Sequence, residues 1–175
     1  QECDEEVRPV AVLLPEEILN NIHKRKTADL FAAPLALPLA METVDPPRAE
    51  AAITAVRSLG AACQILDDIK DLPDDACSGR HNLLVSIAAQ NRGDDDPWLE
   101  QLREVDQWEW SPWERFPAEA AIAAEMALAR FQQSFDALAK IDIALSASQR
   151  DAVVNSIFAL LKVPRELAPA RIGAH

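Results

Sequence analysis

The sequence contains no tyrosine and only four glycines, against 12 prolines. A β-sheet protein draws on aromatic residues for its strands and on glycine for its tight turns. This composition therefore argues against a sheet and favours helices that are separated or bent by prolines.

Long apolar runs are also absent. The longest, LFAAPLALPLAM at residues 30–41, contains two prolines and is too short to cross a bilayer. The first six residues, QECDEE, are acidic and polar, so no signal peptide is predicted. These features predict a soluble protein with no integral membrane segment.

Positive charge is scarce: 17 Lys and Arg residues face 29 Asp and Glu residues, which gives a formal net charge of -12. Nucleic acid and anionic membrane surfaces would repel such a chain, so the charge argues against both as partners. The cysteines, Cys3, Cys63 and Cys77, are odd in number and form no CxxC pair. This favours reduced thiols and a cytoplasmic localisation.

What the sequence does contain is helical periodicity, over most of its 175 residues. The chain is long enough to form one packed core, and 49% of its residues are hydrophobic. We therefore expect a single all-α domain over residues 1–175. Helices are predicted at residues 15–26, 47–72, 81–91 and 117–141. Another is predicted from residue 27 onward, with a bend at Pro34 and Pro38, and a last one follows a Ser146–Gln149 capping box.

The segment between residues 94 and 116 is the least regular, and it holds all four tryptophans. Two interpretations stay open for it: core packing beneath an irregular segment, or a surface for a partner. The three histidines, His23, His81 and His175, are scattered, and we expect surface or packing roles for them.

Five aspartates lie between residues 67 and 75. On the predicted helix, Gln64, Asp67, Asp68 and Asp71 are spaced by three and four residues and share one face. Carboxylates so close together repel each other unless a cation lies among them. Mg²⁺ prefers such oxygen ligands and takes others from a substrate's phosphates. The pattern predicts diphosphate binding through magnesium, and the alternative is a solvated acidic helix end.

Here the sequence resembles a known family. The stretch LGAACQILDDIKDLPDDACSGRHNLLVSIAAQ at 59–90 is similar to the second aspartate-rich region of trans-isoprenyl diphosphate synthases, the polyprenyl synthetase family. IHKRKTADLF at 22–31 resembles its Lys-Thr element, where a helix breaks, and QECDEE resembles its Gln-x-x-Asp. AEMALARFQQSFDALAKI at 124–141 and ASQRDAVVNSIFALLK at 147–162 resemble its closing helices.

The resemblance implies a helical bundle of the class I isoprenoid synthase type and a set of site residues. Asp67 would be the main ligand of a Mg²⁺ that bridges an allylic diphosphate, and Asp71 and Asp68 would hold that ion's waters. The groups implied to contact or flank the diphosphate are Lys26, Thr27, Gln64 and Arg80, the last standing where the family has lysine.

One part of the family pattern is missing: its first DDxxD, which an Arg-Arg pair follows. Asp94 to Asp96 do not replace it, since they come too late in the chain and are predicted to lie in a loop. The resemblance thus implies the C-terminal half of a prenyltransferase that is inactive alone. It would transfer an allylic prenyl group to isopentenyl diphosphate or another acceptor, as a homodimer or with a chain or segment that bears the first motif. Two alternatives are a non-catalytic synthase-like subunit and a class I terpene cyclase.

Overall fold

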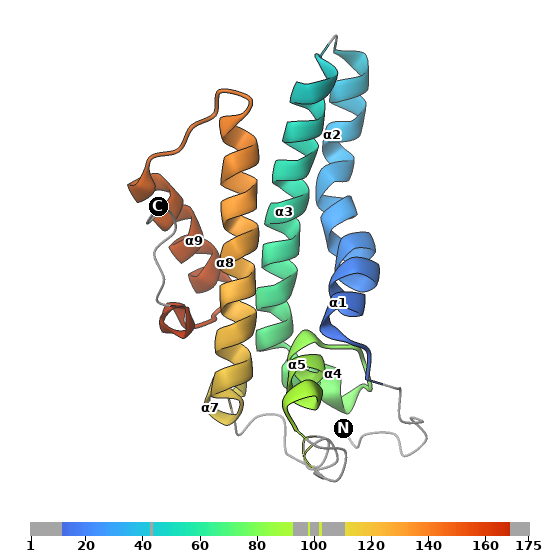
Figure 1. Ribbon diagram of the computed structural model, residues 1–175, viewed down its shortest axis with the longest axis vertical. Coiled ribbons are helices and arrows are strands. Elements are labelled where there is room, and N and C mark those ends of the chain that lie inside the picture. Colours follow the sequence, from blue (N-terminus) through green and yellow to red (C-terminus); the bar gives the residue numbers. More distant parts are fainter. Residues whose placement is uncertain (1–11, 43, 93–97, 99–101, 103–110, 169–175) are drawn as a thin grey trace.

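The computed structural model describes residues 12–42, 44–92, 98, 102 and 111–168. These residues form helices and no strand, so the predicted all-α class is confirmed. The long helix α3 (Pro46–Lys70) lies between α2 (Asp29–Met41) on one side and α8 (Pro117–Ala139) on the other (Figure 1). None of the described helices is both long and apolar enough to cross a membrane.

The first helical run corrects one expectation. α1 (Pro15–Glu17), η1 (Ile18–Ala28) and α2 follow one another without a break, whereas the sequence predicted a break between Lys26 and Thr27. Neither of these residues stops a helix. Instead η1 is a π-helix, a rare form that often occurs at functional sites.

The predicted bend in the second helix has its prolines where expected, inside α2 at Pro34 and Pro38. Each proline removes one backbone donor, so the carbonyl groups of Leu30 and Pro34 lose a helical partner. Leu30 and Leu37 are exposed on this helix, so water can reach that face. The helix continues through both prolines as far as Met41.

Helix α3 confirms the predicted long helix to within two residues at each end, and it packs chiefly on α8. Their contact is built largely from alanines, which let the two helices approach closely. On α2, the Phe31 ring lies against Gly60, where a Cβ would come within 2.8 Å of Phe31 Cγ. Buried residues of the α3 and α8 faces include Ala55, Ala62, Ile65, Leu66, Ile69, Ala120, Ala123, Ala124, Ala127 and Phe131.

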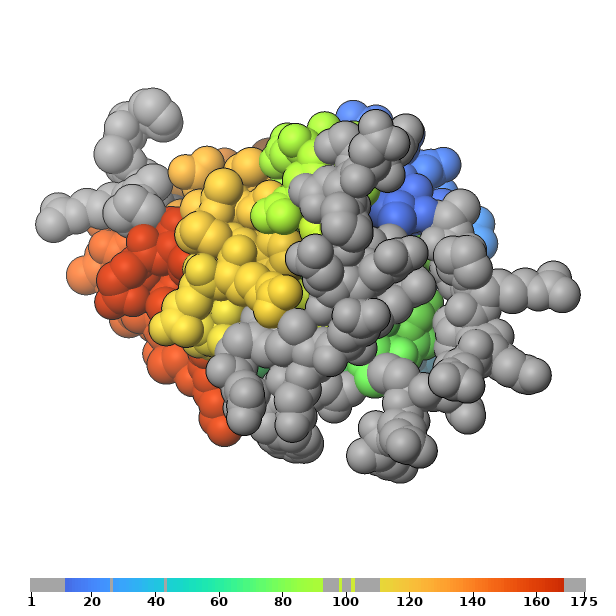
Figure 2. Space-filling view, turned by 90° about the horizontal axis from the view of Figure 1, so that it is seen from below, coloured from blue at the N-terminus to red at the C-terminus, as the bar shows by residue number. Residues whose placement is uncertain are grey.

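The end of the bundle at which α3 stops is covered by three short helices, α4 (Leu72–Cys77), α5 (Leu83–Asn91) and α7 (Pro112–Arg115) (Figures 1 and 2). Asn82 caps α5 by accepting a hydrogen bond from the backbone N–H of Leu84 at 2.9 Å. At the other end of the chain, the Ser146–Gln149 capping box is confirmed and starts α9 (Ala147–Leu160), which the turn η2 (Arg165–Leu167) follows.

The structure favours the core interpretation for two of the tryptophans. Trp98 is buried and meets the Phe116 ring edge-on, with 6.1 Å between the ring centroids, and Trp113 packs against the same core. The Arg92 guanidinium lies over both Trp98 and Phe116. Trp108 and Trp110 lie outside the described residues.

The cysteines also correct an expectation. Cys77 is disulfide-bonded, whereas Cys63 is free, so the predicted reduced state is wrong for Cys77. An odd number of cysteines does not by itself prevent a disulfide from forming. The cytoplasmic localisation stays a prediction, and this disulfide does not favour it.

Candidate functional site

A hollow of about 90 Å³ opens where α3 ends, between η1, α3 and the segment that follows α4. We call it the aspartate hollow. Five predicted site residues line it, and Thr27 joins them through a hydrogen bond to Gln64. Lys26 lies on η1, but its side chain is outside the described residues, as are Gln1 to Asp4 and Asp94 to Asp96. The lining residues are Ile22, His23, Gln64, Asp67, Asp68, Asp71, Asp75, Arg80 and His81.

Asp68 points into the protein and its carboxylate is enclosed by donors. It is 4% exposed. Its Oδ2 lies 2.9 Å from His23 Nε2 and accepts the backbone N–H of Leu83 at 2.9 Å, and its Oδ1 accepts from Gln64 Nε2 at 2.9 Å. Buried carboxylates are tolerated only when so satisfied. Asp68 thus ties η1, α3 and the start of α5 together.

Thr27 and Gln64 are held in place by the same network. The Thr27 hydroxyl donates to Gln64 Oε1, which leaves the amide nitrogen of Gln64 to donate to Asp68. A glutamine amide whose two ends are both engaged has one orientation. The three side chains therefore form a fixed wall of the aspartate hollow, with Thr27 supplied by the π-helix.

Asp67 and Asp71 differ from Asp68 because their carboxylates reach solvent, with 40% and 34% of the side chain exposed. Lys70 lies beside both, with its Nζ 3.0 Å from Asp71 Oδ1 and 3.9 Å from Asp67 Oδ1. The hydrogen bond to Asp71 raises the pKa of Lys70, so this ammonium group stays charged. It offsets part of the repulsion between the two carboxylates.

The far wall of the hollow is fixed by Asn82. Its amide nitrogen donates to the backbone carbonyl of Asp68 at 2.7 Å and to Asp75 Oδ2 at 3.0 Å. Arg80 then lies with its Nη1 3.7 Å from Asp75 Oδ1, while 66% of its side chain stays exposed. The backbone of Gly79 next to it has a φ of 62°, which glycine adopts without strain. Arg80 is thus placed at the hollow but keeps donors for a ligand.

Burial raises the pKa of Asp75, against the opposing hydrogen bond from Asn82. When folding raises the pKa of a carboxyl group, the folded state favours the protonated form of that group. The ionised form therefore lowers the folding stability, and this loss develops as pH rises through the folded pKa. We expect Asp75→Asn, which keeps an acceptor for Asn82, to raise the melting temperature at pH 7. The gain should vanish by about pH 3, below the ordinary carboxyl pKa of about 3.9.

Thermal melts followed by circular dichroism at both pH values check this expectation, with Asp74→Asn as the matched control. Asp74 is an exposed neighbour in the same acidic segment. A gain for Asp75→Asn that matches the control, or that is as large at pH 3 as at pH 7, would contradict the role of burial.

Magnesium is the ion that the sequence pattern suggests, and the residues present fit one kind of magnesium site. Among the described residues, no group of three or more His, Cys, Asp or Glu side chains stands ready to hold a metal. Mg²⁺, however, is commonly held by one or two carboxylates and completed by water and substrate phosphates. Asp67, near the end of α3, and Asp71, the residue that caps this helix, are both partly exposed and match that arrangement.

Sequence reasoning missed three residues that build this site: His23, Asp75 and Asn82. For His23 a signal existed, since it precedes Thr27 by four residues and so shares its helix face. No sequence pattern could have predicted the roles of Asp75 and Asn82, because their contacts depend on how the chain turns between α3 and α5.

Comparison with known proteins gives one match. The sequence model of the polyprenyl synthetase family matches residues 3–81. Neither the curated proteins nor the solved structures contain a match to the chain. Over residues 3–81, which include every predicted site residue, this chain is similar to the polyprenyl synthetase family.

Proposed function

We propose that this chain binds the diphosphate group of an allylic prenyl diphosphate through Mg²⁺, as the second aspartate-rich half of an isoprenyl diphosphate synthase. The observation that carries the proposal is the aspartate hollow itself. Two partly exposed carboxylates, an exposed arginine and a fixed glutamine lie together there, at the end of α3 and in the segment after α4. The family match covers these same residues.

The carboxylates of the motif divide into two roles in this proposal. Asp67 and Asp71 would hold the metal, because their oxygens reach solvent. Asp68 instead positions Gln64 and His23, because three hydrogen bonds already occupy its oxygens. Magnesium would stabilise the charge on the departing diphosphate. Arg80 would add a fork of donors to the phosphate oxygens, and Lys26 of η1 would pair with the same group.

The proposed reaction is transfer of the allylic group to isopentenyl diphosphate or another acceptor, and it needs a second half. Helix α2 offers a surface for that half. Leu30, Leu37 and Met41 lie on one side of it and are 65%, 67% and 77% exposed. We propose that this apolar stripe packs against the chain or segment that carries the first aspartate-rich motif, in a homodimer or a heteromer.

One observation favours a second candidate, a non-catalytic subunit that regulates an active synthase. The Lys70 ammonium already lies 3.0 Å from Asp71, where it neutralises a carboxylate that a metal would use. In that case the chain would contribute helices to an assembly without binding magnesium. The two candidates differ in whether Asp67 and Asp71 take up the ion when a diphosphate is present.

A magnesium titration separates them. We expect Mg²⁺ to bind weakly to the chain alone, since the hollow supplies too few ligands, and at least tenfold more tightly with a non-hydrolysable prenyl diphosphate analogue. Calorimetry measures both affinities. Asp67→Asn should abolish the enhancement, and Asp74→Asn, which lies outside the hollow, should retain it. Equal Mg²⁺ affinity with and without the analogue would overturn the proposed function and favour the regulatory subunit.

A further inference from the structure

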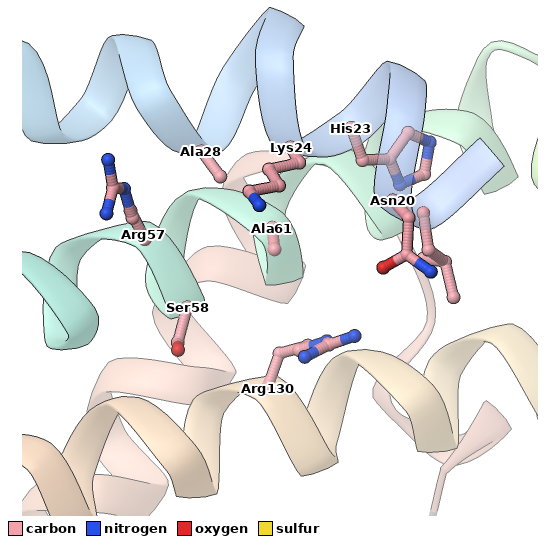
Figure 3. Close-up of a pocket in the computed structure, with 9 residues that line it drawn as sticks. Asn20, His23, Lys24, Ala28, Arg57, Ser58, Ala61 and Arg130 are labelled. Atoms are coloured by element: carbon pink, nitrogen blue, oxygen red, sulfur yellow. The ribbon is translucent and has the colours of Figure 1, made fainter. Parts of the chain in front are cut away.

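A second cavity, of about 180 Å³, lies further along the bundle between η1, α3 and α8 (Figure 3). We call it the basic cavity. Each of the three helices contributes one cationic side chain to its lining: Lys24 from η1, Arg57 from α3 and Arg130 from α8. Asn20 and Ser58 add neutral polar groups, and none of the lining residues carries a carboxylate.

The charges of the basic cavity are only partly neutralised. Arg57 Nε lies 2.9 Å from Asp29 Oδ1, so this arginine has an acidic partner. Arg130 donates from Nη1 to the neutral amide oxygen of Gln133 at 3.0 Å, and among the described residues it has no acidic partner. Within the part of the chain that the structure describes, no ion pair is found for Lys24. In a protein with a net charge of -12, this is an unusual concentration of positive charge.

His23 supplies an independent sign that a ligand belongs here. The side chain is 2% exposed, and its Nε2 is taken by Asp68. Its other ring nitrogen, Nδ1, is buried without a hydrogen-bond partner among the described residues. His23 lines the basic cavity as well as the aspartate hollow, and Figure 3 shows its ring beside Asn20. Buried polar atoms are rarely left unpaired, so a bound group that completes Nδ1 is the physical expectation.

We propose that the basic cavity binds a phosphate-class oxyanion, a phosphate or diphosphate group. Lys24 and Arg130 would supply the charge, and the guanidinium fork suits phosphate oxygens. Ser58 and Asn20 would donate hydrogen bonds, and His23 Nδ1, which is an acceptor while Nε2 donates to Asp68, would accept one from a protonated phosphate oxygen. The proposal goes beyond the proposed function, because this site needs no divalent cation. The aspartate hollow repels an anion unless a metal is present, whereas the basic cavity attracts one directly.

Calorimetric titration of the full chain with inorganic diphosphate in EDTA tests the proposal, with inorganic phosphate as a second arm. We expect saturable binding of one diphosphate per chain. Lys24→Gln with Arg130→Gln should weaken it at least tenfold. The matched control, Lys140→Gln with Lys162→Gln, removes the same charge from exposed positions outside the cavity and should change the affinity less than twofold. Asp67→Asn should also leave it unchanged.

A second measurement does not depend on the variants. In a chain labelled with ¹⁵N at its three histidines, diphosphate in EDTA should shift the Nδ1 resonance of His23 and leave those of His81 and His175 in place. No binding in EDTA, equal weakening by the control pair, or loss of binding in Asp67→Asn would overturn the proposal. The proposed function would fail in a different experiment, because it predicts only that the prenyl diphosphate analogue increases the affinity for Mg²⁺.

Discussion

Replacing Asp67 by alanine is expected to lower consumption of an allylic diphosphate by about 10²–10³-fold, the usual cost of losing one preorganised electrostatic element. The measurement uses this chain together with the polypeptide that bears the first aspartate-rich motif. The isolated chain should turn over no substrate, because the hollow can organise charge on only one side of the diphosphate. Its cationic and metal-binding groups come from η1, from α3 with its cap residue Asp71, and from the segment after α4.

Asp74→Ala is the matched control for this prediction. Asp74 belongs to the same acidic segment but is exposed and does not line the aspartate hollow. Its removal should leave the rate within about twofold. Robust turnover by the isolated chain, or an unimpaired Asp67→Ala assembly, would place the chemistry elsewhere. An assembly with no activity in any form would instead support the regulatory subunit.

The second large effect concerns stability. Asp68→Ala is expected to lower the free energy of unfolding by about 3 kcal/mol or more, since leaving a single buried donor unpaired costs about 1–3 kcal/mol. The reason is that three buried donors, on His23, Gln64 and Leu83, would lose their acceptor together. Unpaired buried donors carry the full desolvation cost. Denaturant unfolding followed by circular dichroism measures the change.

Two further variants show whether the network causes that loss. Asp68→Asn keeps one acceptor oxygen and should cost less than Asp68→Ala. A double-mutant cycle with His23→Ala should be strongly non-additive, because each single variant already breaks the same contact. If Asp68→Ala unfolds at the denaturant concentration of the unmutated chain, the carboxylate does not hold η1 to α3.

The candidate site shows how far spacing alone can reach. The spacing of Gln64, Asp67 and Asp68 correctly placed them on one helix, α3, whereas Asp71 follows the last residue of that helix as its C-cap. Spacing did not separate the three carboxylates, because Asp67 and Asp68 are neighbours on that helix. Their difference arises from contacts with His23, 45 residues earlier, and with Leu83, 15 residues later. Such contacts form only after the helices have packed.

The sequence by itself determined the helical class, the extent of α3 and the Ser146–Gln149 cap, because periodicity and capping are local properties of the chain. Only the tertiary structure decided that Asp68 is buried, that the Lys-Thr segment continues as a π-helix, and that Lys24 and Arg130 share a cavity. Each of these depends on which helix faces meet. Which helix faces contact each other depends on the packing of side chains that are distant in sequence, and a local sequence pattern does not predict that packing.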